Sequence, residues 1–189
     1  CQMGAIQMGA SGHTAREILE HYYPGAKIGL TAQGLDWVSS RSERMELLST
    51  DPGQEEFVLT AAEKALREAE ARTHFNFAGR VQLKLFPTVA TFRNATGESG
   101  TVAASTRGRV VRLQPAKTLQ AKNVLESVLL HELLHVVLES QGQAGQPWWF
   151  REGLTLELTG DKPTDARYVQ ALQRVRRLVG EYGLDRVLT

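Results

Sequence analysis

The chain has 189 residues, of which 42% are hydrophobic and 23% are charged. These values are typical of one folded globular domain with a small appendage, and they argue against long disordered regions. The formal net charge is only +1, so no overall field favours nucleic acid, which we exclude as a partner, or an acidic membrane surface.

The N-terminal region predicts a short helix. Thr14 and Glu17 have the spacing of a capping box, which favours a helix over 15–22 that ends at Pro24. Cys1 is the single cysteine, so an internal disulfide is excluded. Because the first residue is Cys rather than Met, we expect a processed end or a fragment of a longer protein. No segment of this chain has the roughly 20 consecutive apolar residues of a bilayer-spanning helix.

Two weak strands followed by a helix are expected next. The strands lie at 36–39 and 44–48, and Asp51-Pro52 is typical of a helix start, with Asp as the N-cap and Pro at the first helical position. This helix should run to about residue 73. Its apolar stripe includes Phe57, and Glu63 lies on its solvated face.

The middle of the chain predicts further strands. Val81–Phe86 alternates apolar and polar residues, which indicates a half-buried strand. A helical turn is expected at 89–94, and two more strands at 101–105 and 109–113. The residues between these last strands, Thr106–Gly108, fit a hairpin turn.

Helices dominate the remainder of the sequence. A long helix is predicted over 119–140, a second over 148–158 and a third over 164–179, with a short helix after Gly183.

The helix over 119–140 contains the sequence His131-Glu132-Leu-Leu-His135. Residues four apart lie on one face of a helix, so the two imidazoles can converge on one ion. Zinc would lower the pKa of a bound water, and Glu132 beside the first ligand could accept its proton as a general base. Apolar residues flank the motif, so its polar side chains would be costly to bury without a partner.

A catalytic zinc needs a third protein ligand. Glu139 lies too far along the helix from His131, by about 12 Å at 1.5 Å per residue. Glu152 on the next helix is the remaining choice, if the loop before it lets that helix fold back antiparallel, and Glu157 is its competitor. We favour Glu152 because the adjacent Gly153 would allow close packing against the metal-binding helix.

Simpler interpretations stay open at this point. The two histidines could merely hydrogen-bond to neighbours inside a buried helix. Glu152 could be a solvated carboxylate favoured by the positive end of the helix dipole. The neighbouring Trp148, Trp149 and Phe150 could wall a cleft or belong to the core.

The motif together with Trp149-Phe-Arg-Glu152-Gly-Leu resembles the gluzincin peptidases, especially the small peptidase MA-like domains, over roughly residues 43–160. The resemblance implies an α+β fold, with a small mixed sheet whose edge strand borders the cleft, packed on two metal-bearing helices and followed by a helical C-terminus. It implies that His131, His135 and Glu152 are zinc ligands and that Glu132 is the base. Sixteen residues separate His135 from Glu152, slightly fewer than in the larger gluzincins. Tyr168 is a weak candidate for the family's oxyanion-stabilising group.

The N-terminal residues resemble a different family. Cys1-Gln-Met-Gly-Ala and Ala15–Gly25 are similar to the C-terminal end of the SpoIID/LytB domain of sporulation and cell-wall-remodelling proteins. We therefore predict two parts, a SpoIID/LytB-like tail over 1–35 and a peptidase domain over 36–189. The resemblance implies a bacterial cell-envelope or secreted protein, and it places no glycan-cleaving residue in this chain.

Two functions follow as expectations. The first is a zinc metallopeptidase that hydrolyses peptide or amide bonds, with peptidoglycan peptides as a possible substrate. The second is a non-enzymatic envelope module with a structural or degenerate zinc site that binds peptidoglycan or a partner. The intact Glu132 favours the first, because a structural zinc site needs no base there.

Overall fold

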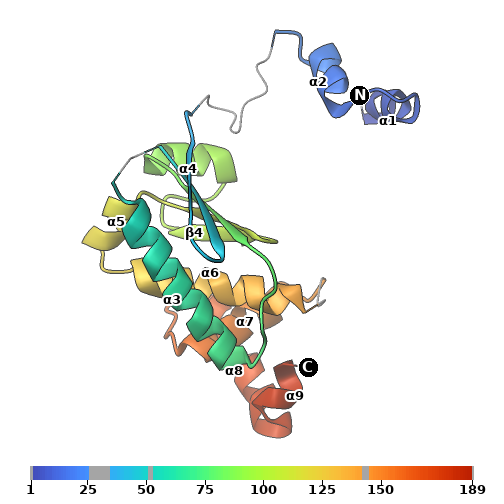
Figure 1. Ribbon diagram of the computed structural model, residues 1–189. Coiled ribbons are helices and arrows are strands. Elements are labelled where there is room, and N and C mark those ends of the chain that lie inside the picture. The colour runs from blue at the N-terminus through green and yellow to red at the C-terminus, as the bar shows by residue number, and fades with distance from the viewer. Residues whose placement is uncertain (1, 26–34, 51–52, 142–144, 189) are drawn as a thin grey trace. The chain divides into compact units, whose positions relative to one another are not determined.

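The computed structural model describes residues 2–25, 35–50, 53–141 and 145–188 (Figure 1). The chain divides into two compact units, Cys1–Leu35 and Asp36–Thr189. The first unit contains α1 (Gln2–Ala10) and α2 (Ala15–Tyr22). The capping box at the start of α2 is confirmed, since the Thr14 amide donates to Glu17 Oε2 at 2.7 Å and the Glu17 amide donates to Thr14 Oγ1 at 3.3 Å. Helix α1 was not predicted.

The second unit is built on a mixed five-stranded sheet, which confirms the α+β class at this level. The strand order is β1-β2-β3-β5-β4. The three central strands are parallel, and the two edge strands, β1 and β4, each run antiparallel to their neighbour. The strands are β1 (Val38–Arg41), β2 (Met45–Ser49), β3 (Val81–Leu85), β4 (Ala104–Arg107) and β5 (Val110–Leu113).

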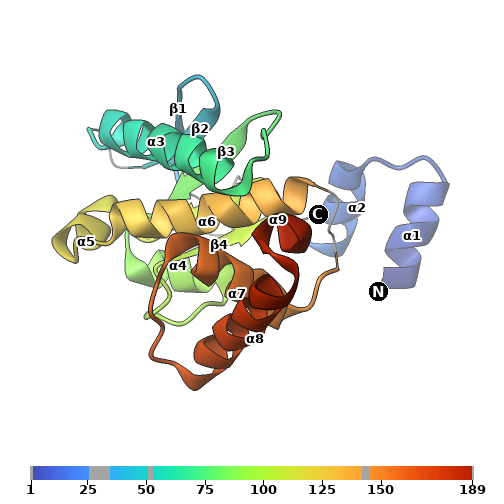
Figure 2. The same ribbon diagram turned by 90° about the horizontal axis from the view of Figure 1, so that it is seen from below.

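Helices cover one face of this sheet in two layers. α3 and α6 lie side by side against the sheet, and α7 and α8 pack beyond α6 (Figures 1 and 2). None of the helices in the described ranges is both long and apolar enough to cross a membrane. The helices of this unit are α3 (Glu55–Thr73), α4 (Val89–Thr96), α5 (Ala116–Ala121), α6 (Leu125–Ser140), α7 (Trp148–Thr159), α8 (Ala166–Tyr182) and α9 (Leu184–Leu188).

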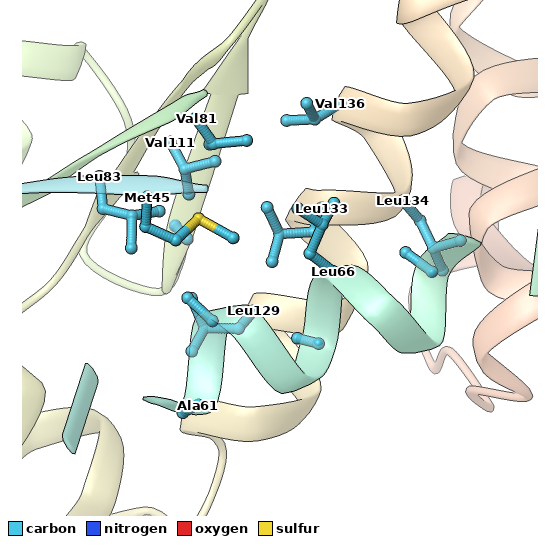
Figure 3. Close-up of a cluster of buried hydrophobic side chains, with 14 of the residues drawn as sticks. Met45, Ala61, Leu66, Val81, Leu83, Val111, Leu129, Leu133, Leu134 and Val136 are labelled. Atoms are coloured by element: carbon cyan, nitrogen blue, oxygen red, sulfur yellow. The ribbon is translucent and has the colours of Figure 1, made fainter. Parts of the chain in front are cut away.

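The core forms where alternate strand residues meet the apolar faces of α3 and α6. Val81, Leu83 and Leu85 of β3 are buried, whereas Gln82 and Lys84 between them are only partly so. This period of two assigns one face of the sheet to the helices. Figure 3 shows the strand residues meeting Leu66 of α3 and the leucines of α6.

Two residues of α3 do not lie where the sequence placed them. Phe57 is 50% exposed, so it does not belong to the apolar stripe. Glu63 is buried rather than solvated, because its Oε1 accepts hydrogen bonds from the Ser42 hydroxyl at 2.6 Å and from the Arg44 amide at 2.7 Å. These bonds tie the helix to the β1–β2 turn. The predicted start at Asp51-Pro52 lies outside the described residues.

The long helix predicted over 119–140 is in fact two helices, α5 and α6. Asn123 adopts a left-handed backbone conformation with φ of 53°, which ends α5 and redirects the chain. Asn tolerates this conformation better than most non-glycine residues. The break sets the axis of α6 independently of the preceding segment.

The observed bounds of β4 also differ from the predicted ones. β4 covers Ala104–Arg107 instead of 101–105, so Thr106 is a strand residue and not part of the turn. The turn lies at Gly108 and Arg109, where the positive φ of Gly108 (58°) suits glycine. This shift brings Thr106 into the sheet edge that faces α6.

Close packing of α7 on α8 depends on Gly153. A Cβ atom on this residue would lie 2.4 Å from the Ala171 carbonyl oxygen and 2.8 Å from Val175 Cγ2, both on α8. The expectation that Gly153 allows close approach to the metal-binding helix is therefore wrong, because the partner is α8. This contact holds α7, which carries Glu152, against α8.

Replacing Gly153 by Ala should destabilise the protein by about 1–3 kcal/mol, because the added methyl overpacks a backbone contact. The control is Gly180→Ala in α8, where a Cβ meets nothing within 4 Å. That variant should be neutral or up to about 1 kcal/mol more stable, since Ala favours the helix. Urea unfolding of both variants measures the difference, and equal stabilities would contradict the packing argument.

Candidate metal centre

Helix α6 carries the first three residues of the candidate site. His131 and His135 are one turn apart, and their Nε2 atoms lie 3.2 Å from each other. Glu132, between them in sequence, is 8% exposed. The leucine and valine neighbours on α6 are buried in the core, so the helix has little freedom to rotate.

Helix α7 brings the fourth residue to the same place. Glu152 Oε2 lies 3.5 Å from His131 Nε2, and its Oε1 lies 3.4 Å from His135 Nε2. α7 begins after Pro147 and ends at Gly160, whose left-handed conformation caps it. The two imidazoles and the carboxylate thus face one another. The helices that carry them, α6 and α7, pack against each other (Figure 2).

The distances among these groups are short enough for them to share one metal ion. Zinc binds imidazole nitrogen and carboxylate oxygen at about 2.0–2.1 Å in a tetrahedron, which places neighbouring ligand atoms roughly 3.3–3.4 Å apart. The two Nε2 atoms are 3.2 Å apart, and Glu152 presents a different oxygen to each ring, at 3.5 Å from His131 and 3.4 Å from His135. One ligand atom from each of the three residues lies within 4.8 Å of the others. His131, His135 and Glu152 could therefore hold a metal ion. Two histidines with one carboxylate are also a ligand set that zinc uses in catalytic sites.

The electrostatics of the site favour a charged carboxylate facing the rings. Burial by itself lowers the pKa of His131, but its hydrogen bond with Glu152 and the neighbouring negative charges outweigh burial and raise that pKa above its ordinary value. Burial raises the pKa of Glu152, whereas hydrogen bonds with His131 and His135 lower it to about 2. Glu152 is therefore an anion at neutral pH, which is the form that binds a cation.

Two threonines contact the site residues. Thr155 Oγ1 lies 3.3 Å from His135 Nδ1, a hydrogen-bonding distance that would leave Nε2 as the nitrogen facing Glu152. The Thr106 hydroxyl of β4 donates a 2.6 Å hydrogen bond to Glu132 Oε2. Sequence reasoning missed both. The position of Thr155, three residues after Glu152 and on the same helix face, was a usable signal.

An ion pair beside the site joins the two helices. Arg151 Nη2 lies 2.5 Å from Glu139 Oε1, so the residue next to Glu152 is anchored to the last turn of α6. Glu139 is thus a helix-docking partner and not part of the ligand cluster. Glu157, the competitor for the third-ligand role, pairs with Arg176 at 2.8 Å and does not join the cluster either.

A cleft of about 630 Å³ opens over His131, His135 and Glu152. Trp148 of α7 and Tyr168 of α8 line it and stack edge to face, with ring centroids 5.1 Å apart. The other two aromatic residues of this stretch, Trp149 and Phe150, pack against the core instead. The remaining lining residues include Glu98, Thr101, Ala104, Ser105, Thr106, Glu132, Arg151 and Asp161.

No protein-family model matches this chain, and a search of curated proteins found no similar sequence.

Zinc binding should depend on Glu152 and not on Glu157. Glu152→Gln removes the anionic ligand, and because even outer-shell substitutions typically cost 10–100-fold in metal affinity, we expect a loss of roughly 100-fold or more. Glu157→Gln, on the same helix, is the matched control and should bind zinc like the unmodified chain. Competition with a chromophoric chelator measures both affinities. Equal affinities in the two variants would remove Glu152 from the site.

In the zinc-free protein, the pair of His131 and Glu152 should contribute to the free energy of unfolding in a way that depends on pH. The lowered pKa of Glu152 contributes stability above its ordinary value of 4.5, and this is lost as the pH falls toward about 2. The raised pKa of His131 contributes stability below 6.5, and this is lost as the pH rises through the folded-state value. The two effects describe one interaction, which is therefore strongest between pH 4.5 and 6.5.

Chelator-treated protein and its Glu152→Gln variant, unfolded in urea, should accordingly differ most near pH 5.5, by on the order of 2 kcal/mol. The difference should shrink at pH 8.5 and again at pH 3. Glu157→Gln serves as the control and should stay within about 1 kcal/mol throughout, as for a pair near the surface. A stability difference that does not vary with pH would contradict the assignment.

Proposed function

We propose that this chain is a zinc-dependent metallopeptidase of the gluzincin type, in which His131, His135 and Glu152 hold the ion and Glu132 is the general base. One observation carries the proposal. The two imidazole nitrogens lie 3.2 Å apart, each lies 3.4–3.5 Å from one of the two oxygens of Glu152, and a further buried carboxylate, that of Glu132, lines the same cleft. The resemblance of the motif and of the Glu152 segment to peptidase MA-like domains supports the same assignment.

Bound zinc would polarise the scissile carbonyl and acidify a water molecule. The chain would supply the remaining parts of the reaction. Thr106 engages Oε2 of Glu132, so we assign proton transfer to Oε1. This oxygen would accept the proton of the attacking water and then donate it to the leaving nitrogen.

The free edge of β4 is suited to bind an extended peptide. The backbone N–H of Gln114 donates to the Ala103 carbonyl at 3.0 Å, so the backbone groups of Ala103 face β5. In an antiparallel pair this direction alternates along the strand, and the backbone groups of Ser105 and Arg107 therefore also face β5. The backbone N–H and C=O of Ala104 and Thr106 consequently point to the free edge. A substrate strand could pair with them by β-augmentation alongside the ligand cluster.

Tyr168 is the residue that we propose to stabilise negative charge on the substrate oxygen. It lines the cleft, and burial together with the charge of Glu152 raises its pKa. A raised pKa keeps the phenol protonated, so that it can donate a hydrogen bond. Its edge-to-face contact with Trp148 fixes the orientation of the ring.

The cellular setting is part of the same proposal. The resemblance of the Cys1–Leu35 unit to the end of a SpoIID/LytB domain supports a bacterial cell-envelope or sporulation protein. Peptides of peptidoglycan are the substrate class that this setting favours. The proposal assigns no glycan chemistry to the first unit.

The decisive variant is Glu132→Gln, which keeps the shape of the base but cannot accept the proton. It should retain stoichiometric zinc by mass spectrometry and lose about 10²–10⁴-fold in turnover of a peptide library. Glu126→Gln at the start of the same helix is the control, since Glu126 pairs with Lys64 at the surface. Chelation should abolish hydrolysis, and zinc should restore it.

Two results would count against the proposal. Full activity of Glu132→Gln would remove this residue from the mechanism. Stoichiometric zinc without any chelator-sensitive hydrolysis would favour a non-enzymatic envelope module whose metal site is structural.

A further inference from the structure

We propose that Thr106 is a positioning residue, which holds the carboxylate of Glu132 in place for proton transfer and connects it to the strand on which the substrate would pair. The catalytic part of this inference rests on the proposed function. The contact itself does not, because it joins two side chains of the protein and neither belongs to the ligand cluster. No feature of the sequence pointed to Thr106.

The contact has the geometry of a strong hydrogen bond. Thr106 Oγ1 lies 2.6 Å from Glu132 Oε2, and an ionised carboxylate can only accept, so the hydroxyl is the donor. A separation in this range is typical of a charge-assisted O–H···O bond. Glu132 is 8% exposed, so water competes little for the same oxygen.

A base that transfers a proton must be held in one conformation. The glutamate side chain has three rotatable bonds, and burial on α6 restricts but does not select among its rotamers. The hydroxyl of Thr106 binds one oxygen and therefore fixes both the position and the rotation of the carboxylate. Such control matters because small misplacements of a reacting group cost large factors in rate.

The location of Thr106 on the sheet makes this contact specific. Side chains alternate along a strand, so Ser105 and Arg107 extend from the opposite face of β4. Ala104 shares the face of Thr106 but has no hydroxyl. Within β4, Thr106 is therefore the one residue whose hydroxyl side chain lies on the face toward Glu132.

Thr106 also takes part in the proposed substrate edge. Its backbone N–H and C=O point away from β5, by the register described above. A peptide strand added at this edge would order the same residue that holds the base. Substrate docking and base orientation would then be coupled through a single residue.

The kinetic test compares Thr106→Val, which keeps the shape and removes the hydroxyl, with Thr106→Ser, which keeps the hydroxyl. For an outer contact of this kind we expect Thr106→Val to lower kcat by about 10-fold or more, with KM changed by less than about 2-fold and zinc content unchanged. Thr106→Ser should restore most of kcat. Thr60→Val, at an exposed position on α3, is the matched control.

The second test needs no activity. Unfolding midpoints of the zinc-free protein are measured for Thr106→Val, for Glu132→Met and for the double variant. Thr106→Val leaves the Glu132 carboxylate without this donor, and Glu132→Met leaves the Thr106 hydroxyl only its longer, 3.4 Å contact with the backbone carbonyl of residue 132. The double variant contains neither polar group. The midpoint loss of the double variant should therefore be clearly smaller than the sum of the two single losses.

Three results would overturn the inference: unchanged kcat in Thr106→Val, equal impairment in Thr106→Ser, or additive midpoint losses. They are distinguishable from failure of the proposed function. If the unmodified chain hydrolyses no peptide, the peptidase proposal fails and with it the catalytic role of Thr106, while the midpoints still decide whether the contact exists. If it hydrolyses peptides and Thr106→Val does so equally well, only the positioning role is lost.

Discussion

The site depends on a helix that is buried along most of its length and yet carries two imidazoles and a carboxylate. Leucines and valines hold α6 between the sheet, α3 and α7, which fixes its rotation and directs His131, Glu132 and His135 toward the cleft. Polar groups in such surroundings are costly unless they are paired. Glu152 meets that requirement, since its carboxylate faces both rings and remains charged with a pKa of about 2. The polar cluster and the packing of α7 on α6 therefore stabilise each other.

Much of this architecture could be predicted from periodicity and turn chemistry. The alternation in Val81–Phe86 and the capping box at Thr14 gave the right elements, because both are local patterns. The long helix over 119–140 was wrong because apolar periodicity continues across Asn123, where a single left-handed residue redirects the chain. Glu63 was misplaced for a different reason. Its partners at Ser42 and Arg44 belong to a distant turn, so composition alone suggested a solvated residue.

The candidate site was likewise predictable only where local sequence patterns determine it. His131 and His135 could be paired from helical spacing, and Glu152 could be selected by excluding nearer carboxylates. The structure brings these three together. Thr106 could not be found in this way, because its contact with Glu132 depends on the strand bounds and on how β4 packs against α6. The close approach of Gly153 to α8 was likewise beyond a sequence argument, since the packing partner of a glycine is set by helix layers.

The position of β4 at the edge of the sheet has one more consequence. A row of unpaired backbone groups recruits any extended chain, including the same edge of a second molecule, and natural sheets limit such self-association with short strands and charged ends. β4 has only four residues and ends at Arg107, so two copies would meet few backbone partners and two like charges. The four-residue length of β4 and its terminal arginine therefore disfavour an intermolecular sheet at this edge.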